Sequence, residues 1–149
     1  MSHARKQIRD YVAVTVLGSL TGSLGAGAIY KTRQHPKTKF PFIAVYTLRE
    51  RNTVENPGYL NENKRYRRQL QVAIDVGVDT SDDALDALCS SIETLMAADE
   101  SMGGGVLAAD LTATDILLVT DAEKPVQQAR MTYEITFRTS AADPETLLA

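Results

Sequence analysis

The feature that most constrains the fold is a regular alternation of residue types near the middle of the chain. Every second residue from Leu70 to Val78 is a large aliphatic one, and the residues between them are polar or small. Successive side chains of a β-strand point to opposite faces, so this pattern predicts a strand with one buried face. Such a strand folds only where other elements supply a core against that face.

Other parts of the chain predict further strands. Residues 40–50 are rich in aromatic and β-branched residues, and Pro41 stands near the start, where a strand tolerates proline. Residues 106–119 and 129–140 are typical of two strands joined as a hairpin. A short strand is expected within residues 28–34. The chain therefore contains enough strands to form one sheet.

Two helices are predicted from the spacing of apolar residues. The first covers residues 3–20, with Ser2 as its N-cap. The second lies within residues 80–99, begins with Thr80 or Ser81 as N-cap, and carries aspartates in its first turns, where the helix dipole favours them. One side of this second helix forms an apolar stripe of Leu85, Leu88, Ile92, Leu95 and Met96.

The order of helix, three strands, helix and two strands predicts an α+β fold. We expect an antiparallel or mixed sheet of about five strands with two helices packed on one face, and a comparatively polar second face. The whole of residues 1–149 is expected to form one domain, since this length suits a single core. Residues 18–28 predict a flexible connector, residues 51–63 a mobile loop and residues 141–149 a frayed tail.

Composition and charge narrow the classes of protein. The chain is 44% hydrophobic and 23% charged, as in globular proteins, and we find no apolar run near the ~20 residues of a membrane helix. The basic and then apolar N-terminus is expected to be a mature helix rather than a signal peptide. Residues 1–78 carry 13 Lys and Arg against 5 Asp and Glu, whereas residues 79–149 carry 3 against 14. This asymmetry suits a protein that presents opposite charges on two surfaces.

The sequence offers little for catalysis or metal binding. Its two histidines, His3 and His35, have no recognisable partner motif, and the single Cys89 excludes an internal disulfide. Cys89 lies beside the apolar stripe and is expected to be a small buried residue rather than a nucleophile. We therefore expect no enzyme activity, no cofactor and no metal ligands.

A cluster of cations, Lys64, Arg65, Arg67 and Arg68, surrounds Tyr66 just before the alternating strand. Three interpretations are open. The cations could contact nucleic acid with the tyrosine stacked on a base, although a sequence pI near 5.4 argues against a polyanionic partner. They could be a solvated strand end that protects a sheet edge from aggregation. They could also form a surface that contacts another protein.

The chain resembles the tail terminator family of tailed bacteriophages, the minor tail protein U type. The resemblance covers almost the whole chain and is carried by the order and spacing of several segments rather than by any one motif. These segments are HARKQIRDYVAVTVLG, FPFIAVYTLRE, RRQLQVAIDVGV, SDDALDALCSSIETLMAADESMGG and EKPVQQARMTYEITFRT.

The resemblance implies a structural virion protein. Members of this family form a hexameric ring on the last ring of the tail tube, stop its polymerisation and provide the surface for head or neck attachment. The implied partners are further copies of the chain, the tail tube protein and a head–tail connector or neck protein. No membrane and no sequence-specific nucleic acid is expected, although phage DNA would pass through the ring. The implied location is the head-proximal end of the virion tail, after assembly in the bacterial cytoplasm. Magnesium is associated with ring formation in this family, but no ligand cluster in this sequence identifies a site.

A ring is built from contacts between two different patches, and complementary charge fixes their orientation. We therefore expect the cations and the neighbouring loop to contact a subunit or the tube. An adaptor protein of the neck or of tail completion is the alternative function, and a nucleic-acid-binding module is a further one. The candidate interface residues are Arg49, Arg51, Glu55, Tyr59, Lys64, Arg65, Arg67 and Arg68.

Overall fold

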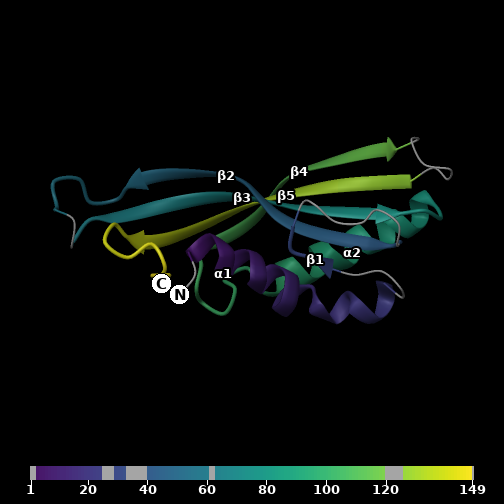
Figure 1. Ribbon diagram of the computed structural model, residues 1–149, viewed down its shortest axis with the longest axis horizontal. Helices are drawn as coiled ribbons and strands as arrows, with labels where there is room; N and C mark the ends of the chain where they lie inside the picture. Colours follow the sequence, from purple (N-terminus) through teal and green to yellow (C-terminus); the bar gives the residue numbers. More distant parts are fainter. Residues whose placement is uncertain (1–2, 25–28, 33–39, 61–62, 120–125, 149) are drawn as a thin grey trace.

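The computed structural model describes residues 3–24, 29–32, 40–60, 63–119 and 126–148. It has two layers, with a long twisted sheet on one side and the helices on the other (Figure 1). The α+β class predicted from the sequence is confirmed. The sheet is mixed and has five strands, because β1 runs parallel to β2 and all other neighbours are antiparallel.

The strands follow the order β1-β2-β3-β5-β4 across the sheet. Strand β4 therefore forms one edge, and at the other edge β1 pairs only with Ile43 and Ala44 of β2. The central pair of β3 and β5 is paired without interruption from Arg65 to Val78. The bounds of the strands are Ile29–Tyr30 for β1, Phe42–Val54 for β2, Arg65–Val78 for β3, Ala108–Val119 for β4 and Val126–Ser140 for β5.

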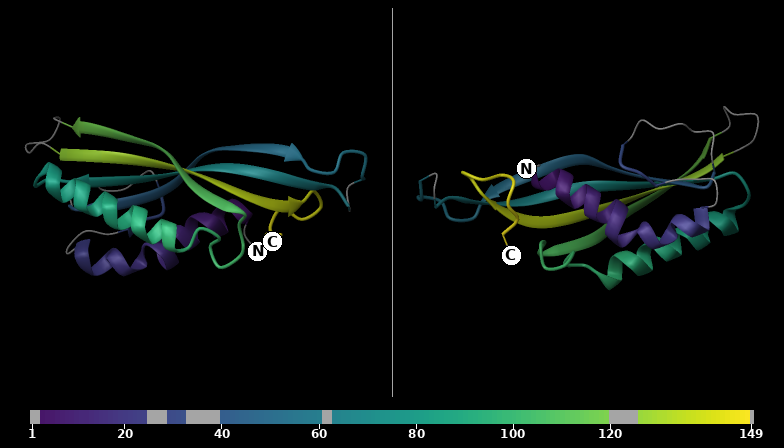
Figure 2. Two further views of the ribbon diagram at one scale, coloured as in Figure 1. Left: turned by 180° about the vertical axis from the view of Figure 1, so that it is seen from behind. Right: turned by 60° about the horizontal axis from the view of Figure 1, so that its bottom comes forward.

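The helical layer consists of an N-terminal helix and one long helix. Helix α1, Ala4–Asp10, continues into a π-helical segment η1, Tyr11–Val16, and is followed by a 3-10 helix η2, Gly18–Leu24. Helix α2 spans Asp82–Ala98, and the Ser81 side chain caps it by accepting a hydrogen bond from the Ala84 N–H at 3.2 Å. Figure 2 shows both helices under the same face of the sheet.

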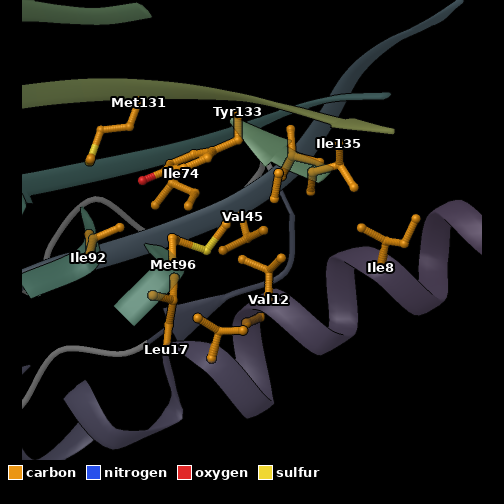
Figure 3. Close-up of a cluster of buried hydrophobic side chains, with 14 of the residues drawn as sticks. Ile8, Val12, Leu17, Val45, Ile74, Ile92, Met96, Met131, Tyr133 and Ile135 are labelled. Atoms are coloured by element: carbon orange, nitrogen blue, oxygen red, sulfur yellow. The ribbon is translucent and has the colours of Figure 1, made fainter. Parts of the chain in front are cut away.

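The core lies between these two layers (Figure 3). The alternating residues of β3 are fully buried there, and so are the matching positions of β5. Burial of apolar surface at about 25 cal/mol per Å² is the main favourable contribution to such a core. The side chains that meet include Ile8, Val12 and Leu17 from the N-terminal helix, Ile92 and Met96 from α2, and Val45, Ile74, Met131, Tyr133 and Ile135 from the sheet.

The second face of the sheet is less uniformly polar than the sequence predicts. At the end of β2 beside β1, a small buried cluster forms on this face, with Tyr30 and Phe40 packed against it. Its buried members are Phe42, Ala44, Tyr46 and Ala73. Short side chains on β3 in this region, including Gly77 opposite Phe42, leave room for the rings.

Two β-bulges interrupt the pairing of the outer strands. One lies in β2 between Thr47 and Arg49, and the other lies in β4 between Leu111 and Ala113. An extra residue in one strand of an antiparallel pair bends that strand and increases its local twist. Both bulges lie at the same level of the sheet, because Thr47 and Leu111 are connected through one row across β3 and β5.

Several predicted boundaries are wrong. The N-cap of α1 is His3, whose Nδ1 accepts from the Arg5 N–H at 3.1 Å, rather than Ser2, which lies outside the described residues. Gly18–Leu24 forms a 3-10 helix in the segment expected to be a loop. Residues 51–54 belong to β2 and not to the loop, since they pair with residues 66–69 of β3.

The C-terminal segment is also more ordered than predicted. The carbonyl of Pro144 accepts a hydrogen bond from the Ala4 N–H at 3.1 Å, and the Leu148 N–H donates to the Arg138 carbonyl at 2.9 Å. The Gln7 side chain donates to the Glu145 carbonyl. The tail expected to fray is thus tied to α1 and to β5.

Gly77 provides a test of the packing on the second face. A Cβ at this position would overlap the ring of Phe42 directly across the β2–β3 pair. We expect Gly77→Ala to destabilise the protein by about 1–3 kcal/mol, as overpacked sites do. Thermal or urea unfolding measures the change.

The matched control is Gly18→Ala, since no heavy atom lies within 4 Å of its Cβ position. Combining Gly77→Ala with Phe42→Leu should recover part of the loss, because the smaller side chain removes the overlap. Equal stability of Gly77→Ala and the wild type would show that the ring of Phe42 is free to move aside.

Candidate assembly surface

The candidate surface lies where β2 and β3 extend beyond the helices (Figure 1). The turn between these strands is held by Asn56. Its Oδ1 accepts from the Arg65 N–H at 2.7 Å, and its amide group donates to the Asn63 carbonyl. The Glu55 N–H donates to the Arg65 carbonyl at 3.0 Å, which adds one more backbone hydrogen bond beyond the strand ends. Backbone and side-chain hydrogen bonds therefore shape this end of the hairpin.

Four of the predicted interface residues share the solvent-facing side of the sheet. Arg49 and Arg51 pair with Gln71 and Gln69, which point away from the helices. Arg65 and Arg67 lie on the same side, at alternate positions of β3. All four arginines are exposed.

The positive charge of this surface extends onto β5. Arg67 lies directly opposite Arg138 in the register of β3 and β5. Like charges opposite one another across two strands are mildly destabilising. The Arg138 Nε donates to Glu55 Oε1 at 2.7 Å, so Glu55 offsets part of this repulsion. An acidic surface from another molecule would relieve the remainder.

Two more of the predicted residues, Tyr59 and Lys64, lie nearby. Tyr59 is 57% exposed near the tip of the turn. Lys64 is half-buried, and its carbonyl accepts from the Ala141 N–H at 2.9 Å, which joins the turn to the chain after β5. A shallow hollow runs between Tyr59, Arg65 and Ser140.

Arg68 is wrongly predicted as a surface residue. It is only 9% exposed and points toward the helix side, because it shares the face of Leu70. Its guanidinium group donates to Glu50 Oε2 at 2.9 Å and to Thr139 Oγ1 at 2.8 Å. The Glu50 side chain is 7% exposed, so this is a buried ion pair. Arg68 therefore serves the fold rather than a partner.

The position of Tyr66 also weakens the nucleic-acid interpretation. Tyr66 lies on the opposite face from Arg65 and Arg67, and the Arg68 guanidinium covers its ring at 5.4 Å from the centroid. A base stacked on this ring would have to replace that cation–π contact. The exposed arginines and the aromatic ring thus do not form one surface for a nucleotide.

A charged cluster on the solvent-facing side is not apparent from the sequence. Asp75 accepts from the Tyr46 hydroxyl at 2.6 Å and from the Arg130 Nε at 3.0 Å, and Arg130 also lies 5.8 Å from the centre of the Tyr46 ring. The hydrogen bond to Asp75 raises the pKa of Arg130. These residues are far apart in the chain, and only the register of β2, β3 and β5 would have revealed them.

Cys89 and His3, the described side chains considered for catalysis or metal binding, lie in positions that serve the fold. Burial, followed by the charges of Asp86 and Glu93, raises the pKa of the Cys89 thiol to about 11, so this thiol is protonated at neutral pH. Burial lowers the pKa of His3, which caps α1. His35 lies outside the described residues. Within the described ranges, no three His, Cys, Asp or Glu side chains come together as a metal site would require.

A hydrogen bond connects the two helical segments. The Tyr11 hydroxyl donates to Asp99 Oδ2 at 2.6 Å, just after the end of α2. This bond lowers the pKa of Asp99 and raises that of Tyr11. The Gly103 N–H also donates to Asp99, at 3.0 Å, so one carboxylate holds the helix end and the turn after it.

No protein-family model matches the chain, and no curated protein matches it either. None of the helices in the described part of the chain has both the length and the apolar character needed to cross a membrane.

The buried ion pair gives a clear stability prediction. We expect Arg68→Met to destabilise the protein by about 3–5 kcal/mol, because it removes the buried cation at 2.9 Å from the Glu50 carboxylate and leaves only the half-exposed Arg5 at 3.9 Å. Denaturant unfolding measures the loss. Arg67→Met is the matched control. Arg67 precedes Arg68 in the sequence but is exposed, so its replacement should change the free energy of unfolding by no more than about 0.5 kcal/mol.

A second variant separates the ion pair from simple packing. Arg68→Met combined with Glu50→Leu removes both charges and should recover most of the lost stability. If the double variant is no more stable than Arg68→Met, the loss of stability comes from the packing of the arginine stem and not from the Glu50 carboxylate left without Arg68.

Proposed function

We propose that this protein is a tail terminator of a tailed bacteriophage. In this role it forms a homohexameric ring that caps the tail tube, stops tube polymerisation and provides the attachment surface for the head or neck. The proposal follows from the resemblance of the segment order, and the observed α+β fold is compatible with it. It predicts a location at the head-proximal end of the virion tail, with phage DNA passing through the ring.

The single observation that carries the proposal is the projecting basic end of the β2–β3 hairpin. Arg65 and Arg67 are exposed there, on strands that extend beyond the helices (Figure 1). No helix of the described residues lies over them, and the negative charge of the chain is concentrated in its second half. A protomer with separated positive and negative surfaces suits a closed ring of head-to-tail contacts.

Ring formation and tube capping test the proposal directly. The purified protein should form six-membered rings when concentrated or when supplied with tail tubes, as measured by native mass spectrometry and electron microscopy of tube ends. Added protein should also limit the length of growing tubes. A protein that stays monomeric and leaves tube length unchanged contradicts the proposal. Binding to a neck component without any ring would favour the alternative of a neck or tail-completion adaptor.

The basic hairpin can be tested by reversing its charge with Arg65→Glu and Arg67→Glu. Both side chains are exposed, so the melting temperature should change little. Exposed ion pairs contribute only ~0.2–1 kcal/mol each, but reversal replaces attraction by repulsion at every interface of a ring. We expect a large loss of rings or of tube capping.

The neutral pair Arg65→Gln and Arg67→Gln serves as the control and should lie between wild type and the reversed variant. Added salt should weaken wild-type assembly and narrow the difference, because it screens exposed charges. A reversed variant that melts normally and still forms rings and caps tubes at low salt would show that these arginines are only a solvated strand end.

A further inference from the structure

Strand β4 leaves a long edge of the sheet open. It pairs with β5 on one side from Ala108 to Val119, and no described strand lies on its other side. At about 3.3 Å per residue, such a strand presents roughly 40 Å of backbone whose outward N–H and C=O groups can pair with another chain. Natural proteins usually protect edges of this kind with charges or a covering element.

Part of this edge is apolar. Three successive side chains near the end of β4 are exposed, Ile116 by 67%, Leu117 by 52% and Leu118 by 61%. Helix α2 packs mainly on β3 and β5, and this part of β4 stays exposed. Consecutive residues of a strand point to opposite faces, so apolar groups lie on both sides of the edge. An added strand would remove apolar surface from water on both faces.

The surroundings of β4 are acidic. Asp110 of β4 lies directly opposite Glu134 of β5, and among the described residues neither carboxylate forms an ion pair. Glu93 of α2 and Glu100, which follows this helix, line a hollow together with Asp110. The sequence contains no Lys or Arg from residue 69 to residue 123. Asp115 lies opposite Arg130 of β5, but Asp110 has no cation opposite it, so an occupant of the edge beside Asp110 should carry positive charge.

The opposite edge of the same sheet is also partly unpaired, and it carries positive charge. Strand β1 pairs only with Ile43 and Ala44, so the outer edge of β2 from Tyr46 to Val54 faces no described strand. This free edge is roughly 30 Å long. It carries Arg49 and Arg51 on the solvent-facing side.

One row of residues shows how the charge changes from one edge of the sheet to the other. It runs from Arg49 through Gln71 and Glu134 to Asp110, from β2 across the sheet to β4. The row begins with a cation and ends with two carboxylates. If a second copy continues the sheet, the cationic end of its β2 arrives beside the acidic end of β4.

We propose that β4 of one protomer pairs with the outer edge of β2 of the next, so that the sheet continues from copy to copy. This inference rests on the proposed ring and identifies its subunit interface. Strand β4 runs antiparallel to β2 within a protomer, because β2 and β5 both oppose β3 and β4 opposes β5. Rotation about a ring axis preserves strand direction along that axis, so the new pair is antiparallel. The solvent faces join, and Asp110 and Asp115 come near Arg49 and Arg51 when the two strands are offset so that Asp110 lies opposite Arg51, since Asp115 then lies on the side of Arg49.

A symmetric contact between two β4 edges fits the charges less well. It would bring Asp110 and Asp115 of both copies onto one continuous face, where like charges repel. A two-fold contact also closes a dimer, whereas pairing of two different edges generates a ring when the rotation closes.

Two charge-reversed variants test this assignment. One reverses the β4 edge with Asp110→Lys and Asp115→Lys, and the other reverses the β2 edge with Arg49→Glu and Arg51→Glu. Each variant alone should lose at least about 10-fold of its ring fraction, because both partners of the interface then carry the same charge. In an equimolar mixture, reversed β4 edges meet reversed β2 edges and unaltered edges meet unaltered ones.

The mixture should therefore recover rings to within about 2-fold of wild type, with the two variants alternating. Native mass spectrometry distinguishes three copies of each variant from other compositions. Thr132→Lys combined with Thr136→Lys is the matched control, since it adds two cations to the same face on the inner strand β5 and should assemble as wild type does.

The outcomes separate this inference from the proposed function. If wild type forms no ring under any condition, the proposed function fails together with the interface. If wild type forms rings but either variant alone assembles equally well, or if the mixture fails to recover while both variants melt as wild type does, the interface assignment is wrong and the ring remains. Recovery of dimers alone would indicate a two-fold contact and would also overturn it.

Discussion

The ion pair between Arg68 and Glu50 determines where the apolar core ends. On the helix side of β3 the large aliphatic residues stop at Leu70, and the next position toward the hairpin is Arg68. Its partner Glu50 lies on β2 opposite Leu70, one position nearer the core on the same face, and both side chains are buried. The alternation of faces continues, but polar groups replace apolar ones. The sheet can therefore extend past the helices without exposing a hydrophobic surface.

The sequence predicts the fold because β3 and β5 alternate strictly and α2 carries a clear stripe. Prediction from the sequence fails for segments whose structure does not depend on the burial of apolar side chains. Residues 51–54 are exposed on both faces, so no apolar pattern marks them, and only backbone pairing with β3 makes them a strand. Gly18–Leu24 and the C-terminal tail fail for a similar reason, since hydrogen bonds to local or distant backbone hold them.

The candidate surface was partly predictable by the same reasoning. Alternation counted from Leu70 correctly places Arg65 and Arg67 on the solvent-facing side. It also places Arg68 on the helix side, and treating the four cations as one cluster overlooked this. The open edge of β4 was not predictable, because Ile116 and Leu118 share the helix-facing side of the sheet and look like core residues. Only the position of α2 shows that no described helix covers them.

The two bulges change whether odd-numbered or even-numbered residues of the outer strands face the helices. In β2 the odd-numbered residues Ile43 and Val45 face the helices before the bulge, whereas the even-numbered Glu50 does so after it. The bulge in β4 makes the same exchange, and Asp115 faces outward beyond it. Deleting Leu48 or Thr112 would remove the bulge and its local bend but leave Arg49 and Asp115 facing outward, because the pairs on the two sides of each bulge are already consecutive. Each extra residue thus inverts the numbering rule for the rest of its strand, so that counting alternate residues across a bulge would assign Arg49 and Asp115 to the wrong face.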